Sequence, residues 1–74
     1  MKNLVGTFVK ERRKRLKLNQ RDLADRAGVG LRFIRELEQG KKSLRIDKVN
    51  QVLALFGHRL GPVMANSAEE ASDA

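Results

Sequence analysis

Basic and amide side chains at the starts of two short amphipathic segments are the groups in this sequence best placed to do chemistry. Gln20 and Arg21 open the first segment, and Arg32 lies near the start of the second. Groups at the start of a helix can hold a phosphate, and a guanidinium in the major groove can bond both O6 and N7 of guanine. The pattern therefore indicates nucleic-acid contacts, although Gln20 also fits a plain exposed glutamine.

Residues typical of enzymes and metal sites are scarce. The chain has no cysteine and one histidine, His58, and it contains neither a glycine-rich phosphate loop nor paired carboxylates beside a plausible pocket. We therefore expect no enzyme activity, no metal and no cofactor. RNA binding fits the charge, but the chain has no tyrosine or tryptophan for base stacking, and its three phenylalanines are mostly needed in the core.

The charge of the chain is high and unevenly distributed. Its 74 residues carry 16 basic and 9 acidic side chains, a formal charge of +7, and every basic residue precedes position 60. Such a domain attracts polyanions, nucleic acid first and anionic membrane second, with simple solubility as the alternative. No apolar run approaches the ~20 residues of a membrane span, so we expect a cytoplasmic protein with no membrane contact, associated with the nucleoid when bound to DNA.

Apolar spacing predicts an all-α fold of four helices. An apolar stripe runs from Leu4 to Leu16, and similar spacings of three and four recur further along the chain. The later helices are predicted over about residues 20–27, 30–39 and 45–56. Asn19 is a good N-cap for the second helix, and Gly28 can take the left-handed conformation that its tight exit requires.

The segment from Gln20 to Gly40 has the form of a helix-turn-helix, whose second helix enters the major groove while the first crosses the DNA backbone. Ala24 must be small because the next helix crosses close to it, and Ile34 and Leu37 must anchor that helix on the core. We expect one DNA-binding domain over residues 1–57. A weak strand signal at 58–64 is interrupted by Gly61-Pro62, and residues 65–74 are expected to be an acidic, disordered tail.

These motifs carry a family resemblance. Leu18–Ala24, Ala27–Val29 and Ile34–Lys41 resemble the XRE/Cro class of lambdoid repressor domains, with the likeness running from about Phe8 to Gly57. Within that class, residues 31–41 and 44–49 are similar to HipB-type antitoxins. The resemblance implies a lambda-repressor-like repressor that dimerises on its own operator and binds a HipA-like kinase toxin. A stand-alone regulator without a toxin is the alternative.

The third helix should divide its residues between the core and the DNA. Ile34, Leu37 and Glu38 are expected to point inward, which turns Leu31, Arg32, Arg35 and Glu36 outward. Arg32 is the best candidate to read a base, whereas Leu31 would contact a thymine methyl or fill space. Glu36 would accept from cytosine N4 or pair with a neighbouring arginine. The candidate DNA-contacting residues are Gln20, Arg21, Leu31, Arg32, Phe33, Arg35, Glu36, Lys41, Lys42 and Ser43.

Several of these positions have more specific expectations. Phe33 either packs partly against the second helix or presses on a sugar or thymine methyl. Arg35 and the basic loop Lys41-Lys42-Ser43 should hold phosphates, and the resemblance gives Gln20 the same role. It also implies a partly buried salt bridge between Arg13 and Glu38, because the matching pair is structural in phage repressors.

Two further expectations concern the fourth helix. Arg45 stands where the family usually has a serine or threonine N-cap, so it is available for a contact, while Asp47 partly compensates through the helix dipole. A homodimer is expected from the small size of the domain and from the resemblance. Its surface would be the fourth helix together with the 58–64 strand, although Gly61-Pro62 weakens the strand pairing.

Overall fold

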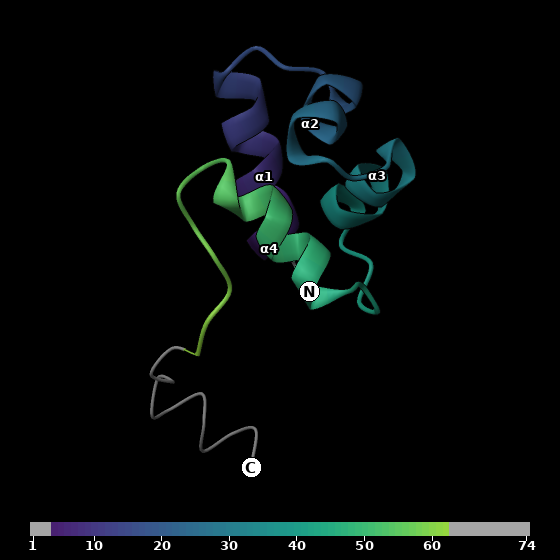
Figure 1. Cartoon of the computed structure of the whole chain (residues 1–74), viewed down its shortest axis with the longest axis vertical. Coiled ribbons are helices and arrows are strands. Elements are labelled where there is room, and N and C mark those ends of the chain that lie inside the picture. The colour runs from purple at the N-terminus through teal and green to yellow at the C-terminus, as the bar shows by residue number, and fades with distance from the viewer. Residues whose placement is uncertain (1–3, 63–74) are drawn as a thin grey trace.

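The computed structural model describes residues 4–62, which contain four helices and no strand (Figure 1). The helices are α1 (Leu4–Arg15), α2 (Gln20–Ala27), α3 (Leu31–Gln39) and α4 (Ile46–Ala54). The predicted all-α helix-turn-helix fold is therefore confirmed. None of the helices in this part of the chain is long and apolar enough to cross a membrane.

Short-range hydrogen bonds set the ends of α2. Asn19 Oδ1 accepts from the backbone N–H of Asp22 at 2.7 Å, and Asp22 Oδ2 accepts from the N–H of Asn19 at 3.1 Å, which forms a capping box. Gly28 ends the helix at φ 73°, a left-handed conformation that favours glycine. Both expectations for this helix follow from local residue chemistry and are confirmed.

Helix α4 is shorter than expected at both ends. It begins at Ile46, and its N-cap Arg45 makes no side-chain capping bond. Instead, Arg45 Nη2 lies 2.7 Å from Asp47 Oδ2, and this hydrogen bond is the main reason that the pKa of Asp47 is lowered. The helix stops at Ala54, and the chain then turns through Gly57 at φ 71°.

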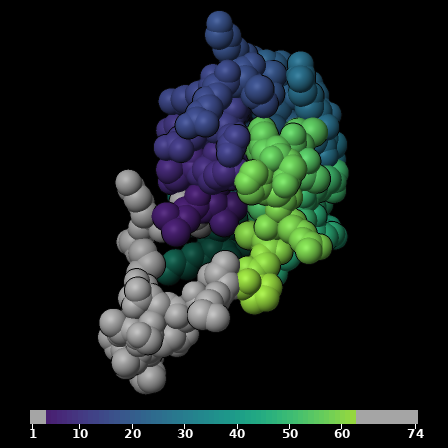
Figure 2. Space-filling view, turned by 90° about the vertical axis from the view of Figure 1, so that its left-hand side faces the viewer, coloured from purple at the N-terminus to yellow at the C-terminus, as the bar shows by residue number. Residues whose placement is uncertain are grey.

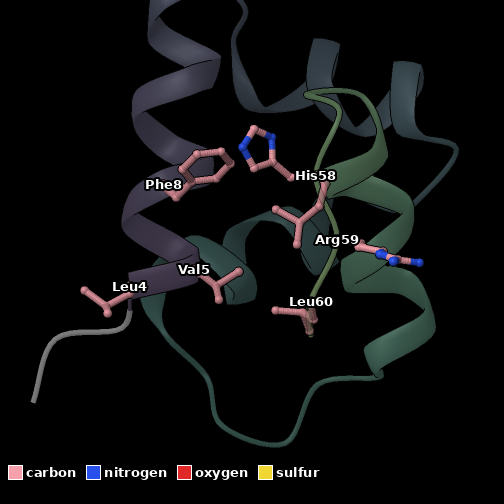
Figure 3. Close-up of a pocket in the computed structure, with 7 residues that line it drawn as sticks. Leu4, Val5, Phe8, His58, Arg59 and Leu60 are labelled. Atoms are coloured by element: carbon pink, nitrogen blue, oxygen red, sulfur yellow. The ribbon is translucent and has the colours of Figure 1, made fainter. Parts of the chain in front are cut away.

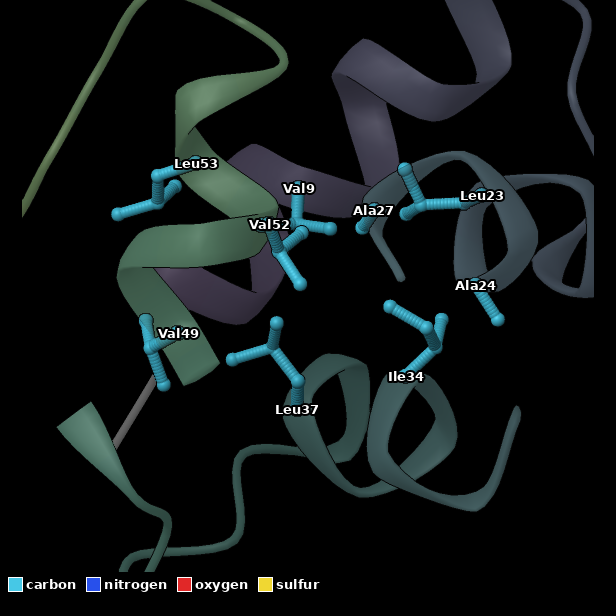
Figure 4. Packing of buried hydrophobic residues seen from close by; sticks show 9 residues of the cluster. All are labelled: Val9, Leu23, Ala24, Ala27, Ile34, Leu37, Val49, Val52 and Leu53. Atoms are coloured by element: carbon cyan, nitrogen blue, oxygen red, sulfur yellow. The ribbon is translucent and has the colours of Figure 1, made fainter. Parts of the chain in front are cut away.

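The core lies between the four helices and is drawn mainly from the last three (Figure 4). Its buried apolar residues are Val9, Leu23, Ala24, Ala27, Ile34, Leu37, Val49, Val52 and Leu53. The apolar stripe expected along α1 is only partly buried: Leu4 is 77% exposed and Leu16 57%. These two leucines stand at the opposite ends of the stripe, whereas Val9, near its middle, is completely buried.

After α4 the chain folds back beside α1 (Figure 2). The ring of His58 lies 4.8 Å from that of Phe8, and Phe8 meets Phe56 edge to face at 6.2 Å. The backbone N–H of Leu60 donates to Asn50 Oδ1 at 2.6 Å. An apolar hollow beside this contact is lined by Leu4, Val5, Phe8, Leu53, His58, Arg59 and Leu60. Arg59 turns its charged end away from the hollow (Figure 3).

The segment expected to form a strand is irregular over 58–62. The predicted pairing of this segment is with a second copy of the chain. The structure contains one copy, so the pairing stays a prediction. Residues 63 and 64 and the acidic tail at 65–74 lie outside the described residues.

Candidate nucleic-acid interface

Helix α3 is fixed to the domain by one face and exposes the other. Ile34 is fully buried and Leu37 is 2% exposed. Arg32 and Arg35 lie on the exposed face, and the Arg32 side chain is 90% exposed. Figure 1 shows α3 packed beside α2 at the edge of the molecule, as a helix must lie to enter a groove.

Leu31 and Phe33 lie differently from the two arginines. Both are half-buried and pack against the core. The expectation that Leu31 points outward is therefore only partly met, because the first turn of α3 lies close enough to the core to take up part of an apolar side chain. Of the two alternatives for Phe33, packing within the protein is the one observed in the free chain. Part of the Leu31 and Phe33 side chains remains accessible to solvent.

Glu36 joins two basic residues on the exposed side of α3. Its Oε2 atom lies 3.3 Å from Arg32 Nε and 3.2 Å from Lys41 Nζ. The hydrogen bond from Lys41, with a smaller contribution from Arg32, lowers the pKa of Glu36 below its ordinary value. Of the two alternatives for this carboxylate, pairing with neighbouring basic groups is the one observed in the free chain.

A second network lies between α1, α2 and α3. Arg13 Nε donates to Glu38 Oε2 at 2.8 Å and Arg13 Nη2 donates to Glu38 Oε1 at 3.0 Å, so the two side chains form a bidentate ion pair. Arg13 Nη1 donates to the carbonyl oxygen of Leu18 at 3.0 Å. The side chains of Arg13 and Glu38 are only 11% and 4% exposed, and the hydrogen bonding of Arg13 to Glu38 is the main cause that raises the pKa of Arg13.

Gln20 also belongs to this network. Sequence reasoning expected the pair of Arg13 and Glu38 but missed the contact of Gln20 with it. The Nε2 atom of Gln20 donates to Glu38 Oε1 at 3.1 Å, so the first residue of α2 is tied to α3. Arg21 is exposed beside it. The missed signal is the spacing: the N-terminal residue of α2 and an inward-facing acid on α3 are brought together by the tight turn between the two helices.

Gln51, on α4, is a further residue that sequence reasoning missed. Its side-chain amide donates to the carbonyl oxygens of Ala27 and Gly28 at 2.7 and 3.1 Å. These carbonyls lie at the end of α2, where a helix leaves acceptors without intrahelical partners. Gln51 thus holds the turn between α2 and α3 from outside the motif.

The loop after α3 completes the basic surface. Lys41, Lys42 and Ser43 are all exposed, and only Lys41 is tied, to Glu36. Arg45, two residues after Ser43, is paired with Asp47. Within residues 4–62 no group of three histidine, cysteine or acidic side chains is placed to hold a metal ion.

This arrangement defines a helix-turn-helix domain, and comparison with known proteins agrees. Residues 9–60 match the helix-turn-helix family. The chain is also 51% identical over 53 residues to an uncharacterized HTH-type transcriptional regulator, y4mF, from Sinorhizobium fredii (strain NBRC 101917 / NGR234). That alignment covers 72% of this chain and 70% of its relative. The chain therefore belongs to the helix-turn-helix family.

Proposed function

We propose that this protein is a sequence-specific transcriptional repressor that binds duplex operator DNA as a homodimer. The observation that carries the proposal is the placement of α3, which is anchored by Ile34 and Leu37 while it turns Arg32 and Arg35 to solvent. The name of the similar Sinorhizobium protein, a transcriptional regulator, supports the same function. The protein would act in the cytoplasm, at the nucleoid, and as a binding protein rather than an enzyme.

Arg32 reads the operator in this proposal. Its guanidinium is exposed near the start of α3, where it can bond a guanine through O6 and N7. Glu36 lies beside it and is available to orient it or to accept from cytosine N4. Leu31 and Phe33 offer their accessible edges to thymine methyl groups or sugars.

The phosphate contacts come from two sides of α3. Gln20 and Arg21 supply the first set from the N-terminus of α2, where the positive end of the helix dipole favours an anion. Arg35, Lys41, Lys42 and Ser43 supply the second. These contacts hold the protein in register but carry no sequence information themselves.

Dimerisation is proposed through α4 and residues 58–64. The exposed apolar side chains of Leu4 and Leu55, at 77% and 44%, lie in or near this region and would gain from a partner surface. A twofold dimer would recognise two half-sites whose centres are about 34–36 Å apart or a multiple of that distance.

The finer proposal is that the repressor is the antitoxin of a toxin–antitoxin operon. It rests on the resemblance of residues 31–49 to HipB-type antitoxins and predicts a HipA-like kinase toxin as partner. Co-expression with the product of the neighbouring gene tests it. Recovery of a stoichiometric complex with a kinase-like protein supports it, whereas a protein that purifies without the neighbour's product supports a stand-alone regulator.

Selection of duplexes from a randomised DNA pool tests the central proposal. The wild-type protein should enrich a twofold sequence, and log K for that sequence should fall by about 0.9 per log unit of salt for each phosphate contact. Arg32→Ala should relax the preference at one position in each half-site and cost ~1–3 kcal/mol there. Lys42→Ala is the control, because it should weaken all sequences alike. Equal binding to selected and scrambled duplexes would overturn the proposal.

A further inference from the structure

The carboxylate of Glu38 serves two helices besides its own. Its Oε1 atom accepts from Arg13 Nη2 at 3.0 Å and from Gln20 Nε2 at 3.1 Å, while Oε2 accepts from Arg13 Nε. The side chain of Glu38 is 4% exposed, so this bonding is almost entirely within the protein. The ion pair alone would balance the charge of Arg13, yet Glu38 Oε1 also accepts a hydrogen bond from the first residue of α2.

We propose that Glu38 is a positioning residue for the DNA contact of Gln20. The carboxylate fixes the glutamine amide so that its second N–H is presented to a phosphate at the N-terminus of α2. The inference rests on the proposed function, because it requires DNA to approach that end of α2.

The direction of the amide follows from the chemistry of its partner. An ionised carboxylate only accepts hydrogen bonds, so it must face the Nε2 side of Gln20 and not the Oε1 side. Nε2 has two N–H groups, and Glu38 takes one of them. A phosphate also only accepts, and therefore needs the other. An untethered glutamine would present its carbonyl oxygen to the phosphate in part of its conformations.

The network also orders Gln20 before DNA arrives. Arg13 holds both oxygens of Glu38, and it is itself held to the carbonyl oxygen of Leu18, in the loop that leads into α2. Binding therefore avoids much of the cost of immobilising a flexible side chain. If the hydrogen bond to Glu38 instead competed with the phosphate for the Gln20 amide, it would weaken DNA binding, because DNA would have to break it.

The test removes the acceptor without stranding a charge. In Arg13→Met/Glu38→Met the net charge is unchanged, and replacement of a buried ion pair by apolar side chains of similar size is often neutral for stability. Affinity is measured at constant salt for a duplex that the wild-type protein selects from a random pool. We expect the double variant to bind about threefold to tenfold more weakly, the effect of ordering one side chain.

A double-mutant cycle shows whether the effect passes through Gln20. Gln20→Ala should weaken binding in the wild-type background and add little in the Arg13→Met/Glu38→Met background. Gln39→Ala is the matched control, an exposed amide on the same helix as Glu38, and it should show no such coupling. Equal or tighter binding by the double variant, or an equal effect of Gln20→Ala in both backgrounds, overturns the proposal.

A second measurement needs no core variant to fold. In the free wild-type protein, the side-chain N–H groups of Gln20 should exchange with water more slowly than those of Gln39. Equal exchange of the two amides overturns the proposal. If the wild-type protein selects no DNA sequence, the proposed function fails, whereas selection combined with an uncoupled cycle removes only the role of Glu38.

Discussion

The side-chain amide of Gln51, on α4, lies 2.7 Å from the carbonyl oxygen of Ala27, the last residue of α2. The same amide reaches the carbonyl of Gly28 at 3.1 Å. A residue outside the helix-turn-helix therefore supplies hydrogen bonds that the end of α2 lacks. This contact fixes the turn on which the direction of α3 depends.

Replacement of Gln51 by methionine should destabilise the domain. The variant keeps most of the side-chain volume but removes both donors, and loss of hydrogen bonds to a partly buried carbonyl costs about 0.5–1.5 kcal/mol. Urea unfolding measures the change. Gln39→Met, at an exposed position, should leave stability within about 0.5 kcal/mol of wild type. Equal stabilities of the two variants would contradict the assigned role.

Alanine substitutions at Gly28 and Gly57 separate backbone strain from this contact. Both glycines have a positive φ, 73° and 71°, so each substitution should cost about 1–2 kcal/mol. A Cβ at Gly28 would also meet the Gln51 amide nitrogen at 3.0 Å, whereas nothing lies within 4 Å of one at Gly57. Gly28→Ala should therefore be the more destabilising in thermal unfolding, and the excess should disappear in a Gln51→Ala background, which removes the end of the side chain that the new Cβ meets.

Single replacements of Arg13 or Glu38 should reduce the free energy of unfolding far more than replacement of both residues together. Arg13→Met or Glu38→Met alone leaves a charged group in a site that is 4–11% exposed and should cost about 3–5 kcal/mol. The double replacement should recover most of that loss. Denaturant unfolding of the four proteins gives the coupling energy. Additive losses would mean that the ion pair contributes little to the packing of α1 on α3.

The pKa of Glu36 gives a prediction about pH. Lys41 and Arg32 lower this pKa from its ordinary value of 4.5. The contribution of the ionised Glu36 carboxylate to stability is therefore complete above pH 4.5, and it is lost as the pH falls through the lowered pKa. Carboxyl resonances titrated by NMR should show a higher pKa for Glu36 in Lys41→Met than in Arg32→Met, since Lys41 is the larger cause. An equal or larger rise in Arg32→Met would contradict this ordering.

Local chemistry explains what the sequence predicted well. Helix caps, turns and helix faces depend on residues that are close together in the chain. They could therefore be predicted from Asn19, from Gly28 and from the inward positions Ile34 and Leu37. The helix-turn-helix could therefore be predicted without a structure. The full burial of Val9 and the exposure of Leu4 were harder to predict from the sequence, because helical spacing alone does not show how far each helix extends beyond its neighbours.

Contacts between helices explain what the sequence missed. Gln20 and Glu38 are 18 positions apart, and Gln51 is 24 positions from Ala27. Neither glutamine differs in type from an ordinary exposed one. The half-burial of Leu31 likewise depends on the angle at which α3 crosses the core, which the turn sets and periodicity does not.

The last turn of α1 is a run of four basic residues, Arg12 to Arg15, and the run has a different meaning in the folded domain than in an isolated peptide. In a free peptide every guanidinium and ammonium group would be open to a polyanion. In the domain, Nε, Nη1 and Nη2 of Arg13 all have partners within the protein. A peptide copied from this run would therefore overstate the affinity of α1 for nucleic acid, and a count of positive charges would overstate it in the same way.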